Sequence, residues 1–250
     1  EVYNGGHDSE IVANNIHDIG KMCTNTSNGE VGIFVQQPRV LVEANLIHDI
    51  GRFLSGENGC STTYQASRDH GIYVDGNAEG SIPGASSITI QNNVFYNTKR
   101  GWAIQIYPGN VSRTKIYHNT FAFENPYQTG HILMGANGSD NEVKNNIFYD
   151  PKTAAIYFYT GTQTNMVVAN NLTFGGTISS GNASGVPFTG NINDLGGLLF
   201  QNIGLLDFHL ALLSPAHDAG LNIPSVTKDF DGIARPQGAG YDLGAHELVP

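Results

Sequence analysis

The sequence predicts an all-β solenoid, a fold in which short strands stack coil upon coil. Three observations support this prediction: the composition, an internal repeat, and the alternation of apolar and polar residues inside each repeat. Charged residues make up 14% of the 250 residues, against about 25% in an ordinary soluble domain, whereas Gly (31) and Asn (26) are abundant. This composition is unlike that of a helical bundle, and the 10% of aromatic residues argues against disorder.

Two kinds of short segment alternate along the chain. The first kind surrounds a polar corner residue, and its copies can be aligned on Asn14, Asn45, Asn92, His118, Asn145 and Asn170. The second kind is an apolar strand, and its copies are centred on Ile33, Ile72, Ile104, Ile132 and Ile156. In the later copies the period falls to about 25 residues, which is typical of solenoids. Two short strands in each period therefore predict stacked coils of parallel strands.

The apolar strands also predict which side chains point inward. Every second residue is apolar, so we expect interior rows made of Ile33, Val35, Ile72, Val74, Ile104, Ile106, Ile132, Met134, Ile156 and Phe158. The residues between them form an outward column that contains Phe34, Tyr73, Gln105, Leu133 and Tyr157. At the corners, we expect the aligned asparagines to pass amide hydrogen bonds along the axis. The alignment also places His17 and His48 at the positions of Phe95, Phe121 and Phe148, which predicts a packing role for both histidines.

Several corner segments follow the order Asn-Asn-apolar-aromatic, such as NNVF from Asn92 and NNIF from Asn145. In this pattern the sequence resembles the right-handed parallel β-helix family, which includes pectate lyase-like proteins, over residues 4–175. The resemblance implies a right-handed parallel β-helix in a protein that is secreted or displayed at the cell surface. Because the chain opens at Glu1 inside a repeat, we expect further coils before it.

A different pattern forms the last part of the chain. The segments SPAHDAG, DFDGIARP and DLGAHE resemble the tail found at the C-terminal end of many secreted bacterial β-helix proteins. The last coil of a solenoid is an open sheet edge that a cap can cover. We therefore expect residues 1–189 to form the β-helix and residues 190–250 to form a cap packed on its last coil. Three carboxylates of the tail are expected to hold turns and pair with an arginine, rather than bind calcium: Asp229, Asp231 and Asp242, with Arg235.

The second and third coils are longer than the period requires. The additional residues fall at 53–69 and 77–87, on either side of the strand 71–75. Insertions in a solenoid become loops on its surface, so two loops that flank one strand predict a cleft. Four side chains at this strand are candidates for catalysis, with the histidine as a general acid or base: Asp69, His70, Tyr73 and Asp75. Arg100, in the next coil, is a further candidate for the base.

Outward-facing and basic residues near this cleft are candidates for substrate binding. Tyrosine rings and amides suit sugar rings and hydroxyls, and cations suit the carboxylates of an acidic polysaccharide. The candidates are Arg52, Arg68, Gln105, Tyr107, His131, Lys152 and Tyr157. A structural interpretation stays open for them, because aromatic residues are favoured on strands in any case and corner cations can pair with neighbouring aspartates.

The charge and the resemblance together point to a class of function. A formal net charge of −10 excludes an ordinary nucleic-acid binder, which needs a basic face, and no apolar run is long enough for a membrane-spanning helix. The resemblance implies a carbohydrate-active protein that cleaves or modifies a polysaccharide, in the manner of a polysaccharide lyase. In such a lyase a cation neutralises the uronate carboxylate while a base removes the C5 proton. Calcium is one candidate cation, and Asp69 or Asp75 would then be among its oxygen ligands.

Two alternatives stay open beside the lyase. A glycoside hydrolase would use Asp69 and Asp75 as its pair of carboxylates. A non-catalytic glycan-binding or adhesive surface module would use the outward aromatic column without turnover. In a secreted protein Cys23 and Cys60 could also form a disulfide.

Overall fold

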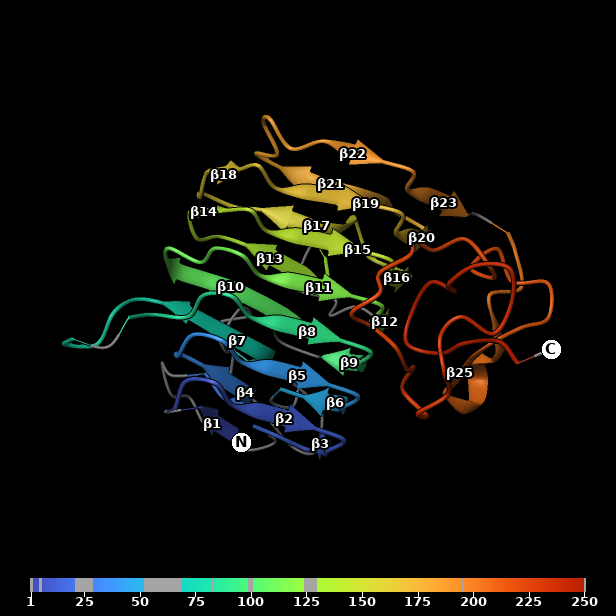
Figure 1. Ribbon diagram of the computed structural model, residues 1–250, viewed down its shortest axis with the longest axis horizontal. Helices are drawn as coiled ribbons and strands as arrows, with labels where there is room; N and C mark the ends of the chain where they lie inside the picture. The colour runs from blue at the N-terminus through green and yellow to red at the C-terminus, as the bar shows by residue number, and fades with distance from the viewer. Residues whose placement is uncertain are drawn as a thin grey trace, which may run out of the picture.

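The computed structural model describes residues 2–4, 6–20, 29–51, 69–81, 83–98, 101–123, 130–194 and 196–249. These residues form an all-β solenoid with three parallel sheets, named A, B and C here (Figure 1). Each sheet contains seven strands within the described residues, and each coil adds one strand to sheet A, then one to B, then one to C. The predicted parallel β-helix is confirmed.

The strands are short, as the spacing of the repeats requires. Sheet A contains β1 (Val2–Asn4), β4 (Val31–Val35), β7 (His70–Gly76), β10 (Ile104–Gly109), β13 (Ile132–Met134), β17 (Ala154–Phe158) and β21 (Thr177–Gly181). Sheet B contains β2 (Glu10–Val12), β5 (Leu41–Glu43), β8 (Thr89–Gln91), β11 (Lys115–Tyr117), β15 (Glu142–Lys144), β19 (Val167–Ala169) and β22 (Phe188–Thr189). Sheet C contains β3 (Asn15–His17), β6 (Leu46–Ile50), β9 (Val94–Thr98), β12 (Thr120–Ala122), β16 (Ile147–Tyr149), β20 (Leu172–Phe174) and β23 (Ile192–Asp194). A small parallel pair, β14 (Gly138–Ser139) and β18 (Gln163–Thr164), lies between sheets A and B in the chain.

The register of sheet A places one isoleucine of each coil in a single interior row. The row contains Ile33, Ile72, Ile104, Ile132 and Ile156, each with no exposed area. The intervening residues form the predicted outward column, in which Phe34, Tyr73, Gln105, Leu133 and Tyr157 are aligned across the strands. Strict alternation in the sequence therefore predicted both faces of this sheet correctly.

A ladder of asparagines follows the corner between sheets B and C. Asn93 Nδ2 donates to Asn119 Oδ1 at 2.9 Å, and Asn119 Nδ2 donates to Asn146 Oδ1 at 3.0 Å. The complete ladder runs through Asn14, Asn45, Asn93, Asn119, Asn146, Asn171 and Asn191. Each coil is thus joined to the next by side-chain as well as backbone hydrogen bonds.

The alignment of these corners differs by one residue from the sequence-based alignment, from the third coil onward. The residues that the sequence-based alignment placed at these corners have positive φ angles, and each comes directly before a ladder asparagine: Asn92, His118, Asn145 and Asn170. They occupy the left-handed corner position that Ala13 (φ 55°) and Ala44 (φ 52°) occupy in the first two coils. The repeated Asn-Asn pair allowed either residue to be aligned, and only the conformation of the corner distinguishes them.

This change of register corrects the prediction for two histidines. His17 and His48 align with Tyr96, whereas Phe95 aligns with Ile47. Since a shift by one residue moves a side chain to the opposite face of a strand, both histidines lie on the outer face of sheet C. Their rings stack at 5.0 Å, and Nδ1 of each lies 2.7 Å from the carboxylate of the following aspartate.

The C-terminal segment, residues 196–249, packs along the flank of the solenoid. It contains β24 (Phe200–Asn202), the 3-10 helix η2 (Ile203–Leu205) and β25 (Asp207–Leu210), and it runs beside sheet C in Figure 1. Its buried side chains contact the outer face of that sheet, forming a cluster of Val94, Ala122, Ile147, Leu172, Phe200, Phe208, Leu210, Leu243 and Ala245. We expected a cap on the last coil, but the apolar outer face of sheet C needs cover over several coils and takes this segment instead.

Candidate functional site

His70, at the start of β7, is held firmly in a corner of the solenoid. Its Nδ1 accepts a hydrogen bond of 3.0 Å from the backbone N–H of Trp102, and its side chain is 2% exposed. The neighbouring Asp69 is also buried, and its Oδ1 accepts from the N–H of Glu30 at 2.9 Å. Gly101 makes this fit possible, because a Cβ there would lie 1.7 Å from the carbonyl oxygen of Asp69 and 2.6 Å from Nδ1 of His70.

The structure brings His70 and Tyr73 together, with 5.6 Å between their ring centroids. A ring nitrogen that accepts an N–H cannot itself carry a proton. Neutral His70 therefore holds its proton on Nε2. In this state Nε2–H can donate a hydrogen bond, whereas Nδ1 is occupied and cannot serve as a base.

Asp75 lies near the other end of the same strand. Its Oδ1 accepts from the N–H of Asn77 at 2.8 Å, and partial burial raises the pKa of its carboxyl despite that bond. Six residues of strand separate it from Asp69, which corresponds to about 20 Å. The paired carboxylates of a glycosidase lie about 5–9.5 Å apart. Asp69 and Asp75 therefore cannot act as such a pair, which corrects the hydrolase alternative.

The insertion that follows β7 projects from the side of the solenoid (Figure 1). It returns at Ala85, whose N–H donates to the carbonyl oxygen of Asp75 at 2.9 Å. The return is close, since a Cβ on Gly84 would lie 2.2 Å from the carbonyl oxygen of Gly76. One wall of the predicted cleft is thus a described feature, while residues 53–68 of the insertion before β7 lie outside the described residues.

Aromatic side chains gather on the outer face of sheet A, beyond the His70 corner. Tyr107 and Tyr159 are 40% and 52% exposed, and their rings meet edge to face at 6.4 Å. Tyr157 stacks on Trp102 at 5.7 Å with an angle of 5° between the rings, and lies 6.1 Å from Tyr159. We call Trp102, Tyr107, Tyr157 and Tyr159 the aromatic patch.

Gly135 gives the patch its shape. A Cβ at this position would lie 2.7 Å from Leu133 Cδ2 and 3.0 Å from Tyr107 Cδ2. The absent side chain lets the ring of Tyr107 lie over the backbone of the next coil, with Tyr159 beyond it. Gln105, only 8% exposed, lies in the same outward column between Tyr73 and Leu133.

His131 does not belong to this face. It is 4% exposed, and its ring lies 5.8 Å from Phe121 and 6.0 Å from Phe148 inside the solenoid. Burial lowers its pKa to about 4, and Nε2 donates to the carbonyl oxygen of Tyr149 at 3.3 Å. A polysaccharide on the surface cannot reach this ring, so the prediction that His131 binds substrate is wrong.

The predicted basic residues are placed only in part. Lys152 is exposed in the connection from β16 to β17. Arg52, Arg68 and Arg100 lie outside the described residues, as do Cys23 and Cys60. Their roles stay predictions.

Asp229 and Asp242 hold turns, as the sequence led us to expect, whereas Asp231 contacts two histidines and the ion pair of Arg235 is with Glu247 rather than with these aspartates. Asp229 Oδ1 accepts from the backbone N–H groups of Asp231 and Ile233 at 2.9 and 2.8 Å. The carboxylate of Asp242 accepts from the N–H groups of Asp218 and Leu248, both at 2.6 Å. The buried arginine, Arg235, pairs with Glu247.

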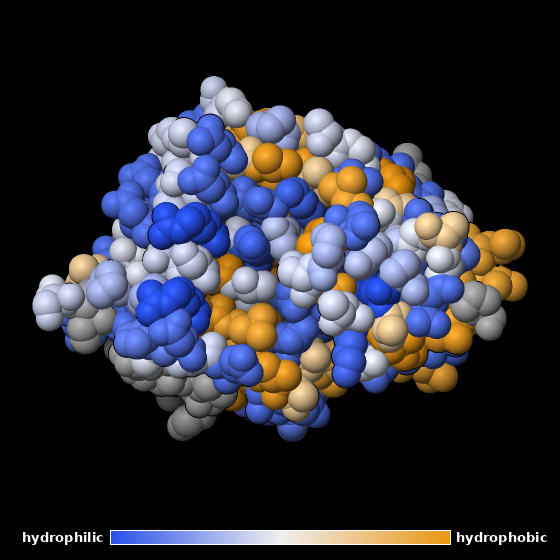
Figure 2. Space-filling model, in the orientation of Figure 1, coloured by the Kyte–Doolittle hydropathy of each residue, from blue (hydrophilic) through white to orange (hydrophobic). Residues whose placement is uncertain are grey.

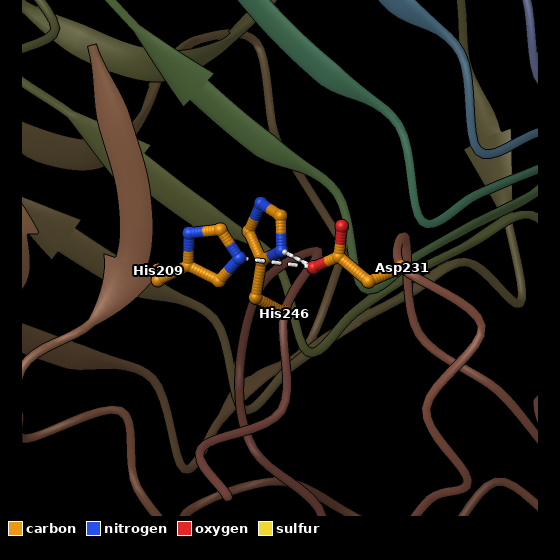
Figure 3. A group of neighbouring side chains, drawn as sticks. All are labelled: His209, Asp231 and His246. Atoms are coloured by element: carbon orange, nitrogen blue, oxygen red, sulfur yellow. Dashed lines mark hydrogen bonds and ion pairs between the residues drawn. The ribbon is translucent and has the colours of Figure 1, made fainter.

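A cluster that the sequence analysis missed joins three parts of the C-terminal segment (Figure 3). Asp231 Oδ2 lies 3.0 Å from His209 Nε2 and 2.8 Å from His246 Nδ1. The two histidines are 37 residues apart in sequence, so only the fold brings them together. The one available signal was that both tail motifs, DFHL and GAHE, contain a histidine.

Comparison with known proteins agrees with this architecture. Within the described residues, the structure contains no helix of the length and apolarity needed to cross a bilayer. No curated protein matches the chain at a significant level. The family model described as "Right handed beta helix region" matches residues 1–193, which is more than half of the sequence. The chain therefore belongs to the right-handed β-helix family.

Proposed function

We propose that this protein is carbohydrate-active and binds a polysaccharide along the outer face of sheet A, at the aromatic patch. The observation that carries the proposal is the pair Tyr107 and Tyr159, which stay 40% and 52% exposed on either side of Gly135. Large aromatic side chains normally bury most of their surface. Two exposed rings beside a glycine offer an apolar surface on which a sugar ring can stack.

Other groups of the same face suit sugar recognition. Tyr157 is fixed by its stacking on Trp102, which reduces the entropy lost when a ligand binds. Gln105 and Tyr73 add an amide and a hydroxyl group along the outward column. β-Helix proteins include polysaccharide-active members, and that resemblance supports the same class of ligand.

Binding is tested with the full chain against a panel of neutral and acidic polysaccharides, by affinity electrophoresis and calorimetry. Tyr107→Ala and Tyr159→Ala should each weaken binding about tenfold or more, because each removes a stacking surface. Leu213→Ala is the matched control, since Leu213 is 86% exposed but lies on the C-terminal segment. Unchanged affinity in both tyrosine variants, or an equal loss in the control, would contradict the proposal.

Cleavage of the bound polysaccharide is the second candidate function, and the contact between His70 and Tyr73 favours it. In lyase chemistry one group removes the C5 proton of a uronate and another protonates the departing glycosidic oxygen. The ring of His70 is buried, so it fits a positioning role beside Tyr73, whose hydroxyl is the candidate proton donor, with Arg100 as the candidate for the base.

His70→Asn is the sharpest variant for this test, because the amide oxygen of asparagine can still accept the N–H of Trp102. We expect folding to be kept and the release of unsaturated products, followed by ultraviolet absorbance, to be lost. Tyr73→Phe keeps the ring and removes the hydroxyl, so it separates proton transfer from stacking. Binding without products in the wild-type protein would identify a glycan-binding module instead of a lyase.

A further inference from the structure

Three side chains converge on one point of the C-terminal segment (Figure 3). His209 comes from β25, Asp231 from the DFDG turn and His246 from the GAHE segment. The two imidazole rings are 4.3 Å apart, and the ligand atoms of all three residues lie within 4.8 Å of one another. Asp231 Oδ2 points between the two rings and contacts a nitrogen of each.

The contacts of His209 orient its ring for binding a cation. Its Nε2 faces Asp231, and its Nδ1 lies 2.6 Å from Oδ1 of Asp207. Nδ1–H can donate to Asp207, because a carboxylate accepts hydrogen bonds. Nε2, which faces Asp231, is then the nitrogen that can bind a cation. Metal-binding histidines are commonly oriented by a carboxylate in this way.

The cluster has room for an ion and for one further ligand. A tetrahedral ion with bonds of about 2.0–2.1 Å holds its ligand atoms about 3.3 Å apart. The two distances from Asp231 Oδ2, 2.8 and 3.0 Å, need to open by only a few tenths of an ångström, and all three ligand atoms lie within 4.8 Å of one another. A cavity of about 340 Å³ lies beside the three residues, and apolar side chains contribute to its lining: Leu46, Val94, Phe208 and Phe230.

We propose that His209, Asp231 and His246 bind a divalent transition-metal ion of the zinc class, with Asp207 orienting His209. Two imidazole nitrogens and one carboxylate oxygen are ligands that suit Zn²⁺, Co²⁺ or Ni²⁺, whereas Ca²⁺ and Mg²⁺ prefer sites made of oxygen alone. Three protein ligands leave a fourth position open toward the cavity. The ion joins three stretches of the C-terminal segment at the point where they pack on sheet C.

A second group of similar composition provides a matched control. His217, Asp218 and Asp242 also lie close together, but both carboxylates already accept backbone N–H groups. They are fixed as turn elements and supply only one histidine.

The experiment uses the full chain, freed of metal by a chelator and titrated with ZnCl₂ by calorimetry and thermal unfolding. We expect one Zn²⁺ to bind and to raise the Tm by several degrees, since an ion that binds only the folded state stabilises it. Co²⁺ should show the visible absorbance of a tetrahedral site, and CaCl₂ should change neither signal. Asp207→Asn should weaken Zn²⁺ binding about 10–100-fold without removing a ligand.

Asp231→Asn and His209→Gln should each abolish this binding. Both are suited to the test because Asp231 and His209 are partly exposed, so the chain should fold even if His246→Gln does not. His217→Gln and the double variant His17→Gln/His48→Gln should bind Zn²⁺ as the wild type does. Absence of binding in the wild type, or unchanged binding in Asp231→Asn, would overturn the proposal.

Discussion

Nη1 of Arg235 lies 2.6 Å from Oε1 of Glu247, and neither side chain has any exposed area. The same guanidinium donates to the carbonyl oxygen of Gly244 at 2.8 Å and to Oδ1 of Asn92 at 3.2 Å. One buried arginine thus connects the end of the chain to a corner of the third coil.

Removal of either partner should strongly destabilise the protein. Glu247→Gln removes the carboxylate that pairs directly with the buried charge of Arg235, and breaking such a pair costs about 3–5 kcal/mol. The free energy of unfolding in urea is the measurement. Lys144→Ala is the control, because the pair of Lys144 with Glu142 is partly exposed and should be worth under about 1 kcal/mol. Equal losses of unfolding free energy in the two variants would show that burial does not increase the contribution of the pair of Arg235 with Glu247.

The asparagine ladder should contribute through its buried amides. Asn119 has no exposed area, and its Nδ2 contacts Asn146 Oδ1 as well as two backbone carbonyl oxygens. Asn119→Ala removes these bonds and also the acceptor of the N–H and Nδ2 groups of Asn93, so it should cost about 1–3 kcal/mol. The exposed Asn182 serves as control, since Asn182→Ala removes an exposed amide at a residue without a positive φ angle. A loss near zero for Asn119→Ala would show that water replaces the amide.

Asn145→Ala tests the junction between the solenoid and the C-terminal segment. Asn145 Oδ1 accepts from the N–H of Leu221 at 2.9 Å, and Nδ2 donates to its carbonyl oxygen at 2.8 Å. We expect a cost of about 1–3 kcal/mol. Hydrogen exchange of the segment around Leu221 should become faster. If exchange changes only within sheet B or C, the contact is not what holds the segment in place.

Acid should weaken the fold through its interior histidines. Burial lowers the pKa of His131 to about 4, from an ordinary 6.5, and lowers that of His118 in the same direction. The unfolded chain therefore binds more protons than the folded chain between these values, and stability falls as the pH falls from 6.5 toward 4. For His131 the loss amounts to about 3 kcal/mol. Urea unfolding across this range should show a shallower pH dependence in His131→Phe, and an unchanged slope would contradict the assignment.

The interior row should respond to loss of volume. Ile104 has no exposed area and lies between Ile72 and Ile132, so Ile104→Ala should cost about 2–5 kcal/mol. Val12→Ala, at a side chain that is 41% exposed, should change the free energy of unfolding by about 0.5 kcal/mol or less. Chemical denaturation measures the loss of unfolding free energy in each variant. Equal losses would show that the coil closes around the smaller side chain of Ile104→Ala.

The sequence was sufficient for sheet A because a period of two residues leaves only one choice of inward face. At the corner between sheets B and C it was not sufficient. There Asn92 and Asn93 are the same residue type, and the left-handed conformation of the first decides which one joins the ladder. The sequence also misplaced His131. This residue directly precedes the strand that carries the outward Leu133, but its ring turns inward and contacts Phe121.

The features that depend on long-range contacts could not be predicted. The lateral placement of the C-terminal segment follows from the apolar outer face of sheet C, which became visible only once the register was known. The cluster of His209, Asp231 and His246 depends in turn on that placement. The exposed leucines of the same segment follow no repeat either: Leu198, Leu205, Leu206, Leu212 and Leu213. Figure 2 shows hydrophobic surface at the right of the molecule, where the C-terminal segment lies.

The course of the C-terminal segment also changes how the coils depend on one another. In a simple solenoid each coil contacts only its neighbours, and coils can unfold one after another from an end. Here one continuous stretch contacts four successive corners, at Asn92, His118, Asn145 and Asn170. It acts as a strap across non-adjacent coils, so that opening one of them must also release the others. The middle of this β-helix should therefore unfold as a single cooperative unit, with the first coils, which the strap does not reach at these corners, opening separately.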